Sequence, residues 1–319
     1  MGGLTESART WDALLTTTQA NYRKQLIDNI FDVFPFLSWM NGSLGEALRG
    51  SSVKRTVSGG ESIVEHLLYE SNSTVNSYSG AGIIDTTLQE GMTIARFNWK
   101  QYAGTVGITG LEKRSNNGEE RMINLLQAKM TQLEMSMRDR MSVDSFSDGS
   151  GNGSKNIGGL ALLVDGTQSD TVGGLSSSTY KWWNATETAS GSFATQGIND
   201  MRTMFNTISF GNDKPDFIVT TQAIFEFYEK SLQPQERFMS NKTADAGFMN
   251  LTFKNIPIVF DRDCTALTMY FLNSKYLSLV VHSDADFNQS PFIAPENQDV
   301  TTSKTIWQGN MTTNNRRKH

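Results

Sequence analysis

The sequence is poor in the residues that cross-link or catalyse. Cys264 is the only cysteine in 319 residues, so the chain forms no internal disulfide and no cysteine-based structural zinc site. The three histidines, His66, His282 and His319, stand far apart in the sequence. The chain has no His-Glu-x-x-His, Gly-x-Ser-x-Gly or Gly-x-Gly-x-x-Gly motif. A Cys264–His282 nucleophile pair has no supporting signature, so no credible active site is visible and we expect a protein that is not an enzyme.

Long apolar runs and excess positive charge are also missing. No run approaches the about 18 apolar residues of a membrane-spanning helix, and the N-terminal residues lack a signal-peptide pattern. The formal net charge of −5 argues against a nucleic-acid reader with a basic face. With 38% hydrophobic residues, the chain is expected to be globular, free of membrane and made in a reducing cytoplasm.

The N-terminal region is predicted to be an arm. Residues 16–33 have helical spacing, with Tyr22, Leu26 and Ile30 recurring every fourth residue, and Pro35 is expected to end that helix. The apolar patch "FPFLSWM", which contains Phe36 and Trp39, has no obvious core of its own. We therefore expect this patch to bury against a neighbouring chain.

Residues 50–98 have a different character. "SIVEHLLYE" and "GMTIARFNW" are typical of strands, and they bracket a polar segment; Tyr69 and Tyr78 belong to this region. The pattern predicts a long two-stranded ribbon. Because an isolated hairpin is marginally stable at best, this ribbon is expected to need packing contacts beyond its own two strands.

A long helix is the strongest secondary-structure signal. It begins near Asn116 or Asn117, with Glu119 and Glu120 in its first turn, and carries one apolar stripe composed of Met122, Leu126, Met130, Leu133, Met137 and Met141. At ~1.5 Å per residue it would be roughly 42 Å long. Residues 160–260 then alternate between strand and helix patterns, beginning with a strand at "GLALLVD", and this alternation predicts a compact mixed α and β unit.

The glycine-rich stretch "SDGSGNGSKNIGGL", residues 147–160, could be a site. A phosphate loop needs Gly-Lys-Ser/Thr before a helix, whereas here Ser154 separates Gly153 from Lys155 and the helix comes first. A calcium loop needs a glutamate at its twelfth position, which is Gly159. We therefore interpret the stretch as a turn in which glycine permits positive φ after a helix end.

Three other features have a structural and a functional interpretation. Trp182 and Trp183 with Tyr180 could form a ligand platform, for example for a glycan, but buried aromatics are the simpler interpretation. The "DRD" at residues 261–263 and the basic "NNRRKH" at the C-terminus are both expected to be solvated. A hydrolase with a non-obvious site in residues 160–260 is a further alternative.

Several strings resemble one known family. "LLYESNSTVNSYSG" with "ARFNWKQYAGTVGITGLEKRSNNGEERMINLLQAKM", "DGSGNGSKNIGGLALLV", "TVGGLSSSTYKWWNAT", "IPIVFDRDCTALTMYFLNSKYLSLVVH" and "TIWQGNMTTNNRR" resemble the major capsid proteins of tailed bacteriophages, which share the Hong Kong 97 fold. This resemblance covers nearly the whole chain. It implies an α+β fold with an N-terminal arm, an extended β-hairpin loop, a long spine helix in a peripheral domain, and an axial α/β domain. The implied boundaries are 1–48 for the arm, 49–98 for the extended loop, 99–159 with 277–319 for the peripheral domain, and 160–276 for the axial domain.

The resemblance also implies a function. The chain would be a structural subunit that self-assembles into the pentamers and hexamers of an icosahedral or prolate phage head enclosing double-stranded DNA. Expected partners are further copies, a separate scaffolding protein, a portal protein, weakly held packaged DNA and any decoration protein, and no cofactor or metal is expected. It would be located in the virion, after assembly in the host bacterial cytoplasm.

Contacts between copies are expected at particular residues. The candidates are Tyr22, Phe36, Trp39, Tyr69, Tyr78, Asn152 and Lys155. The type member of the fold joins its subunits by a Lys–Asn isopeptide bond. Because no lysine occurs from Thr56 to Phe97, no such cross-link is expected from this loop.

Overall fold

The structure is a computed structural model that describes residues 34–42, 53–115, 125–167, 171–232, 251–295 and 298–319. Its contacts divide these residues between two compact units. The first unit contains Ala103–Asp139 and Phe287–Ile306, and the second contains Val33–Tyr102, Arg140–Asp286 and Trp307–His319, within the described ranges. Among the described helices, none has the length and apolar character that crossing a membrane requires.

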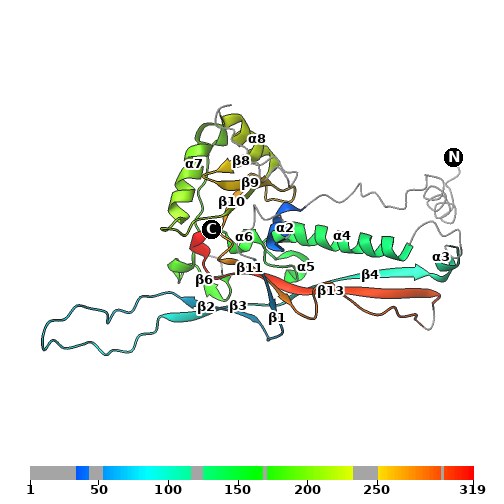
Figure 1. Cartoon of the computed structure of the whole chain (residues 1–319), viewed down its shortest axis with the longest axis horizontal. Helices are drawn as coiled ribbons and strands as arrows, with labels where there is room; N and C mark the ends of the chain where they lie inside the picture. Colours follow the sequence, from blue (N-terminus) through cyan, green and yellow to red (C-terminus); the bar gives the residue numbers. More distant parts are fainter. Residues whose placement is uncertain (1–33, 43–52, 116–124, 168–170, 233–250, 296–297) are drawn as a thin grey trace. The chain divides into compact units, whose positions relative to one another are not determined.

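A mixed sheet with two helices forms the main core of the second unit. The strand order is β10 (Met269–Leu272), β7 (Phe217–Thr220), β9 (Ile256–Phe260) and β8 (Leu251–Phe253). β7 and β9 are parallel, while the outer strands run antiparallel to them. α7 (Phe193–Ile208) and α8 (Gln222–Ser231) lie beside this sheet (Figure 1). The shared core consists of Met201, Phe205, Ile208, Ile218, Phe225, Tyr228, Phe253, Ile256, Ile258 and Phe271.

A second sheet contains strands that are distant in the sequence. β1 (Lys54–Val57) pairs in parallel with β11 (Leu277–His282), and β11 pairs antiparallel with the long β13 (Val300–Thr313). β13 also pairs with β12 (Asn288–Gln289) and β4 (Lys100–Thr109).

The first unit packs the long helix against β4. α4 is described over Leu125–Ser145, and the start of the predicted helix, with Asn116, Asn117, Glu119 and Glu120, lies outside the described residues. A Cβ at Gly104 would stand 2.3 Å from Leu133 Cδ1 and 3.3 Å from Met137 Sδ. Only a glycine therefore lets β4 approach the methionine-bearing face of α4 this closely. The short α3 (Gly110–Ser115), which the sequence did not predict, is tied to α4 by a 2.9 Å ion pair between Lys129 Nζ and Glu112 Oε2.

The apolar patch at residues 34–40 differs from the prediction. Pro35 begins a helix, α2 (Pro35–Met40), because its fixed φ suits the first helical position. Phe36 and Trp39 are buried in this chain: Trp39 stacks on Phe217 at 4.5 Å and Phe36 lies 5.0 Å from Phe146. The expectation that this patch lacks a core of its own is wrong, since the second unit supplies aromatic rings that are distant in sequence.

Residues 261–263 are not the solvated loop that the sequence suggested. Asp261 is buried, and its two carboxylate oxygens accept the backbone N–H groups of Phe36 (3.1 Å) and Asp263 (3.0 Å). Burial raises the pKa of Asp261. No N-cap side chain bonds the first turn of α2, and Asp261 accepts a backbone N–H of that turn instead.

The leucine-rich stretch after the glycines forms a helical turn rather than the predicted strand. α6 (Leu160–Leu163) buries Leu160 and Leu163, which lie three residues apart on one face. The remaining short elements are α5 (Gly151–Ser154), β5 (Thr171–Val172), β6 (Leu175–Ser176), the 3₁₀ turn η2 (Lys181–Trp183) and the 3₁₀ turn η4 (Arg316–Lys318).

The C-terminal residues are not a solvated tail. Arg316 and His319 are buried, whereas Arg317 is exposed. The Arg316 guanidinium donates to the carbonyl oxygens of Leu163 (2.9 Å), Asp165 (2.8 Å) and Trp183 (3.1 Å). The hydrophilic Arg316 is thus buried in the second unit, because carbonyl oxygens in its interior accept hydrogen bonds from the guanidinium.

Burial of His319 predicts a dependence of stability on pH. Burial, with a smaller contribution from the Arg316 charge, lowers the pKa of His319 from 6.5 to about 4. The unfolded chain therefore binds this proton before the folded chain does, and about 3 kcal/mol of stability present above pH 6.5 is lost as the pH falls toward 4. Urea unfolding between pH 7.5 and 4 should show this loss.

The variant His319→Gln isolates that contribution. Its stability should change less over the same pH range, whereas the exposed-histidine control His66→Gln should follow the parent chain. The raised pKa values of the half-buried Asp216 and the buried Asp261 act in the opposite direction, but they are common to all three proteins. Parallel curves for His319→Gln and the parent would contradict the assignment.

Candidate functional site

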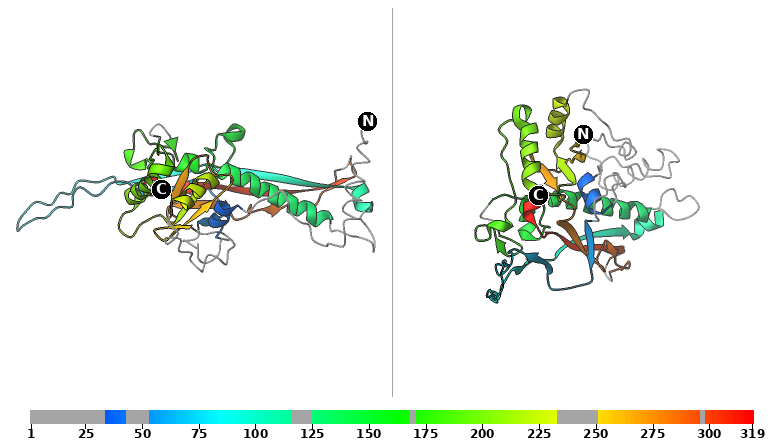
Figure 2. Two further views of the ribbon diagram at one scale, coloured as in Figure 1. Left: turned by 90° about the horizontal axis from the view of Figure 1, so that it is seen from above. Right: turned by 60° about the vertical axis from the view of Figure 1, so that its left-hand side comes forward.

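The most unusual surface is a projecting loop, residues 69–91, between β2 (Ile63–Leu68) and β3 (Met92–Phe97). β2 and β3 pair antiparallel from Ile63↔Phe97 to Leu68↔Met92, as predicted. Beyond this point the chain runs out and returns without forming a strand (Figures 1 and 2). The predicted long ribbon is therefore limited to β2 and β3.

Side chains in the loop compete with strand pairing. Asn72 Oδ1 accepts the backbone N–H of Thr74 at 2.9 Å, and Asp85 Oδ1 accepts that of Thr87 at 2.9 Å. Such local turns occupy backbone groups that a ribbon would need. Across the two legs, Ser73 Oγ donates to Gln89 Oε1 at 2.9 Å.

Large apolar side chains of the loop are left in solvent. Ile83 is 98% and Leu88 95% exposed, and Val75, Tyr78 and Ile84 are also exposed. Single exposed apolar residues are ordinary, but five on one segment mark an interaction surface. The loop also carries Glu70, Asp85 and Glu90 with no lysine or arginine, so this surface is apolar and acidic.

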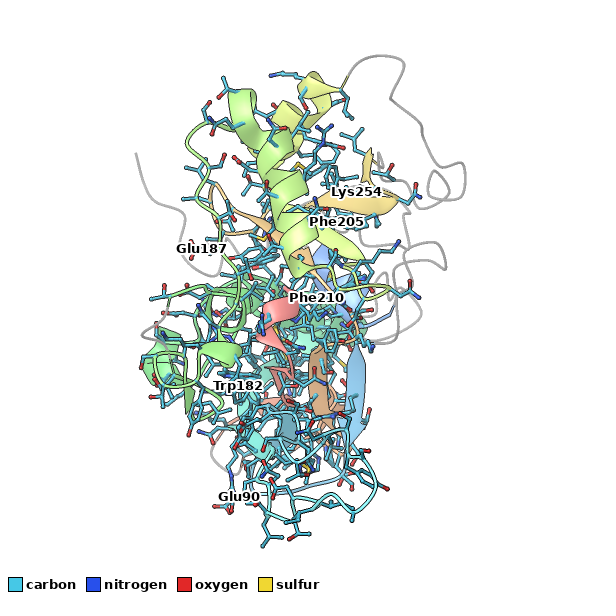
Figure 3. All side chains as sticks on the ribbon, turned by 90° about the vertical axis from the view of Figure 1, so that its left-hand side faces the viewer. Glu90, Trp182, Glu187, Phe205, Phe210 and Lys254 are labelled. Carbon is cyan, nitrogen blue, oxygen red and sulfur yellow. The ribbon has the colours of Figure 1, made fainter. Side chains whose placement is uncertain are left out.

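The root of the loop is held by aromatic stacking. The Tyr69 ring lies 5.3 Å from that of Trp182 at an interplanar angle of 14°, and the Tyr69 hydroxyl donates to the Glu90 carbonyl at 2.8 Å. Figure 3 labels Trp182 and Glu90. Trp183 beneath is buried and donates from Nε1 to the Val172 carbonyl at 2.9 Å. Tyr69 therefore joins both legs of the loop to the body of the second unit.

This stacking bears on the alternative of a ligand platform. Trp183 is buried, and one face of Trp182 is covered by Tyr69 from the same chain. A sugar ring would have to displace Tyr69 before it could stack there. The geometry thus does not favour the glycan-binding interpretation.

The glycine-rich stretch forms an ordered turn on the end of α4. Gly149 and Gly153 have φ of +78° and +65°, as the turn interpretation requires, and Asn152 shares this left-handed conformation. A Cβ at Gly159 would stand 2.4 Å from the Ser145 carbonyl oxygen. Asp148 uses its Oδ1 to accept the Ser150 N–H at 2.9 Å. Within the described part of the chain, no group of three or more histidine, cysteine or acidic side chains could hold a metal ion.

Cys264 has no features of a nucleophile. Burial, with a smaller contribution from Asp261, raises its thiol pKa to about 12, so the thiolate is scarce at neutral pH. Its Sγ lies 3.9 Å from the Thr268 carbonyl oxygen, whereas His282 packs edge-on to the ring of Trp99. The two residues have separate surroundings.

The residues predicted to contact a neighbour fall into distinct groups. Tyr78 is exposed on the projecting loop, and Asn152 and Lys155 are exposed together on the glycine turn. Tyr69 is half-buried at the loop root, Phe36 and Trp39 are buried, and Tyr22 lies outside the described residues. Sequence reasoning missed Ile83 and Leu88, although "GAGIIDTTL" places apolar residues in a polar segment.

Comparison with known proteins supports a single architecture. No protein-family model and no curated protein matches the sequence. The structure is similar to that of a subunit in the cyanophage A-1(L) capsid asymmetric unit (TM-score 0.70, 14% identity, 93% of this chain and 94% of that one). It is also similar to the capsid of Myoviridae phage XM1 (0.53, 14%, 98% and 96%) and to the SrpI encapsulin of Synechococcus elongatus PCC 7942 (0.53, 8%, 99% and 93%). The chain therefore has the fold of tailed-phage major capsid proteins.

Proposed function

We propose that the chain is a structural shell subunit that assembles into the head of a tailed bacteriophage. The observation that carries this proposal is the projecting loop, whose large apolar side chains have no partner surface among the described residues of the same chain. A second copy could supply that surface. The likeness to capsid structures over more than 90% of each chain supports the same conclusion.

In this proposal the loop lies over the adjacent subunit. A contact between two different surfaces of identical chains repeats from copy to copy, and it closes into rings and shells when the rotation permits. Burying one leucine or isoleucine side chain stabilises such a contact by about 1.5–3 kcal/mol. Tyr78 would contribute to this contact, with Asn152 and Lys155 at a second one.

The finer features of the shell belong to the same proposal. They are pentamers and hexamers, an icosahedral or prolate shape, enclosed double-stranded DNA, a scaffolding protein, a portal and assembly in the bacterial cytoplasm. The division into arm (1–48), extended loop (49–98), peripheral domain (99–159, 277–319) and axial domain (160–276) stays a prediction, as does the absence of catalysis.

The size of the assembled protein tests the proposal. Analytical ultracentrifugation and negative-stain microscopy of the purified chain, over a concentration series, should reveal species of five or six times the 35.4 kDa subunit mass or closed particles. Co-expression with the neighbouring genes of its source would supply any scaffold. A monomer under all these conditions would overturn the proposal.

A further inference from the structure

A cavity in the second unit lies apart from the projecting loop. Its volume is about 480 Å³, which is within the range of ligand pockets. It is bounded by α6, by residues 186–190, by α7 and α8, and by β10. Figure 3 labels Glu187, which lines the cavity, and Phe205, which belongs to α7 but does not line it.

Part of the cavity lining is apolar and adaptable. Met201 and Met204 come from α7, Ile224 from α8, and Met269 from the start of β10. Methionine side chains are unbranched and polarisable, so they adjust to differently shaped apolar partners. Leu267, also in the lining, is 85% exposed and is therefore available to cover a bound chain.

The charged side chains that line the cavity are all acidic. Asp165, Glu187 and Asp200 all line the cavity, and no lysine or arginine is among the lining residues. His319, the remaining titratable base in the lining, is buried and neutral at pH 7. The guanidinium of Arg316 bonds the Asp165 carbonyl oxygen from the buried side and does not line the cavity.

The three carboxylates come from different elements. Asp200 is on α7, where it accepts a 2.6 Å hydrogen bond from Ser190 Oγ; Glu187 is exposed on the segment beside it; Asp165 follows α6. A single small cation would pair with only part of this set. A chain with more than one basic side chain could reach several carboxylates while it buries an apolar side chain among the methionines.

We infer that this cavity binds a peptide segment of a second protein in which basic residues alternate with large apolar ones. Charge complementarity selects this occupant. It also excludes the chain's own projecting loop, whose Glu70, Asp85 and Glu90 are unaccompanied by lysine or arginine and would be repelled. The inference concerns a separate surface and does not depend on the shell function.

Fluorescence anisotropy of a labelled peptide tests the inference on the full chain, in whatever oligomer it forms. The probe is acetyl-Ala-Arg-Leu-Lys-Met-Arg-Leu-Ala-amide, and the comparison peptide has glutamate at each basic position. We expect saturable binding of the basic peptide that weakens as the salt concentration rises, and no binding of the acidic peptide. Equal binding of both peptides would overturn the inference.

Matched variants test whether the basic peptide binds at this cavity. Glu187→Gln with Asp200→Asn should weaken binding of the basic peptide about tenfold or more, because each lost carboxylate removes a charge-assisted hydrogen bond. The control Glu134→Gln with Glu226→Gln removes two carboxylates that do not line the cavity and should leave the affinity unchanged. Equal weakening by both pairs would indicate a general charge effect and contradict the site.

Two further measurements separate a peptide from a small cation. A photo-cross-linkable analogue with benzoylphenylalanine in place of the peptide's methionine should label cavity residues such as Met204 or Leu267. Arginine amide should compete only at far higher concentration. Labelling elsewhere, or competition by arginine amide at the peptide's own concentration, would overturn the inference.

Discussion

Replacing Arg316 with alanine should lower the free energy of unfolding by about 3–5 kcal/mol. The side chain is fully buried, and its guanidinium bonds carbonyl oxygens of α6 and of the segments that follow it, together with Ser177 Oγ at 2.7 Å. Removing it leaves several buried acceptors unsatisfied and a cavity beside Trp183. Urea unfolding at pH 7 measures the change.

Two further variants make this result specific. Arg316→Lys should recover only part of the stability, because one ammonium group cannot reproduce the planar fork of donors. Arg317→Ala, at the exposed neighbouring position, should stay within about 0.5 kcal/mol of the parent chain. A similar loss in Arg316→Ala and Arg317→Ala would show that the C-terminal turn has no special role.

Charging the tip of the projecting loop should abolish assembly without unfolding the subunit. In Ile83→Asp with Leu88→Asp, two nearly fully exposed side chains change, so the free energy of unfolding should shift by less than about 0.5 kcal/mol. If those side chains are buried in every contact between copies, each contact loses about 3–6 kcal/mol, and the loss recurs around every ring. Sedimentation should then show subunits in place of closed particles or rings.

The control keeps the added charge and the apolar side chains. Ser77→Asp with Ser79→Asp introduces the same two charges at exposed polar positions of the same loop. It should assemble at a concentration close to that of the parent chain. Normal assembly of the Ile83/Leu88 variant would show that these side chains are not part of the contact.

The sequence predicted secondary structure correctly where the spacing of apolar side chains is compatible with only one kind of element. The long helix was predicted as it occurs over Leu125–Ser145, since an apolar repeat of 3.6 residues sustained over several turns restricts the choice of structure. "GLALLVD" failed because a short apolar run is equally compatible with a strand and with one turn of buried helix. The loop beyond β2 and β3 failed because Asn72 and Asp85 bind their own backbone.

The candidate site was only partly visible for a similar reason. Tyr78 and the glycine turn stood out by composition, but exposure depends on what the rest of the chain covers. Phe36 and Trp39 look like a surface patch in the sequence and are core residues in the fold. Ile83 and Leu88 look like ordinary core residues and are the most exposed apolar side chains of the loop.

The sequence by itself determined that no internal disulfide can form and that familiar catalytic motifs are missing; it also determined the long helix, the paired strands β2 and β3, and an acidic loop without lysine. These properties follow from residue identity and from spacing along the chain. Only the tertiary structure decided which apolar and charged groups are buried. It placed Asp261 under α2, Arg316 among carbonyl oxygens, Tyr69 on Trp182 and three carboxylates around one cavity, because burial arises from contacts between residues that are distant in sequence.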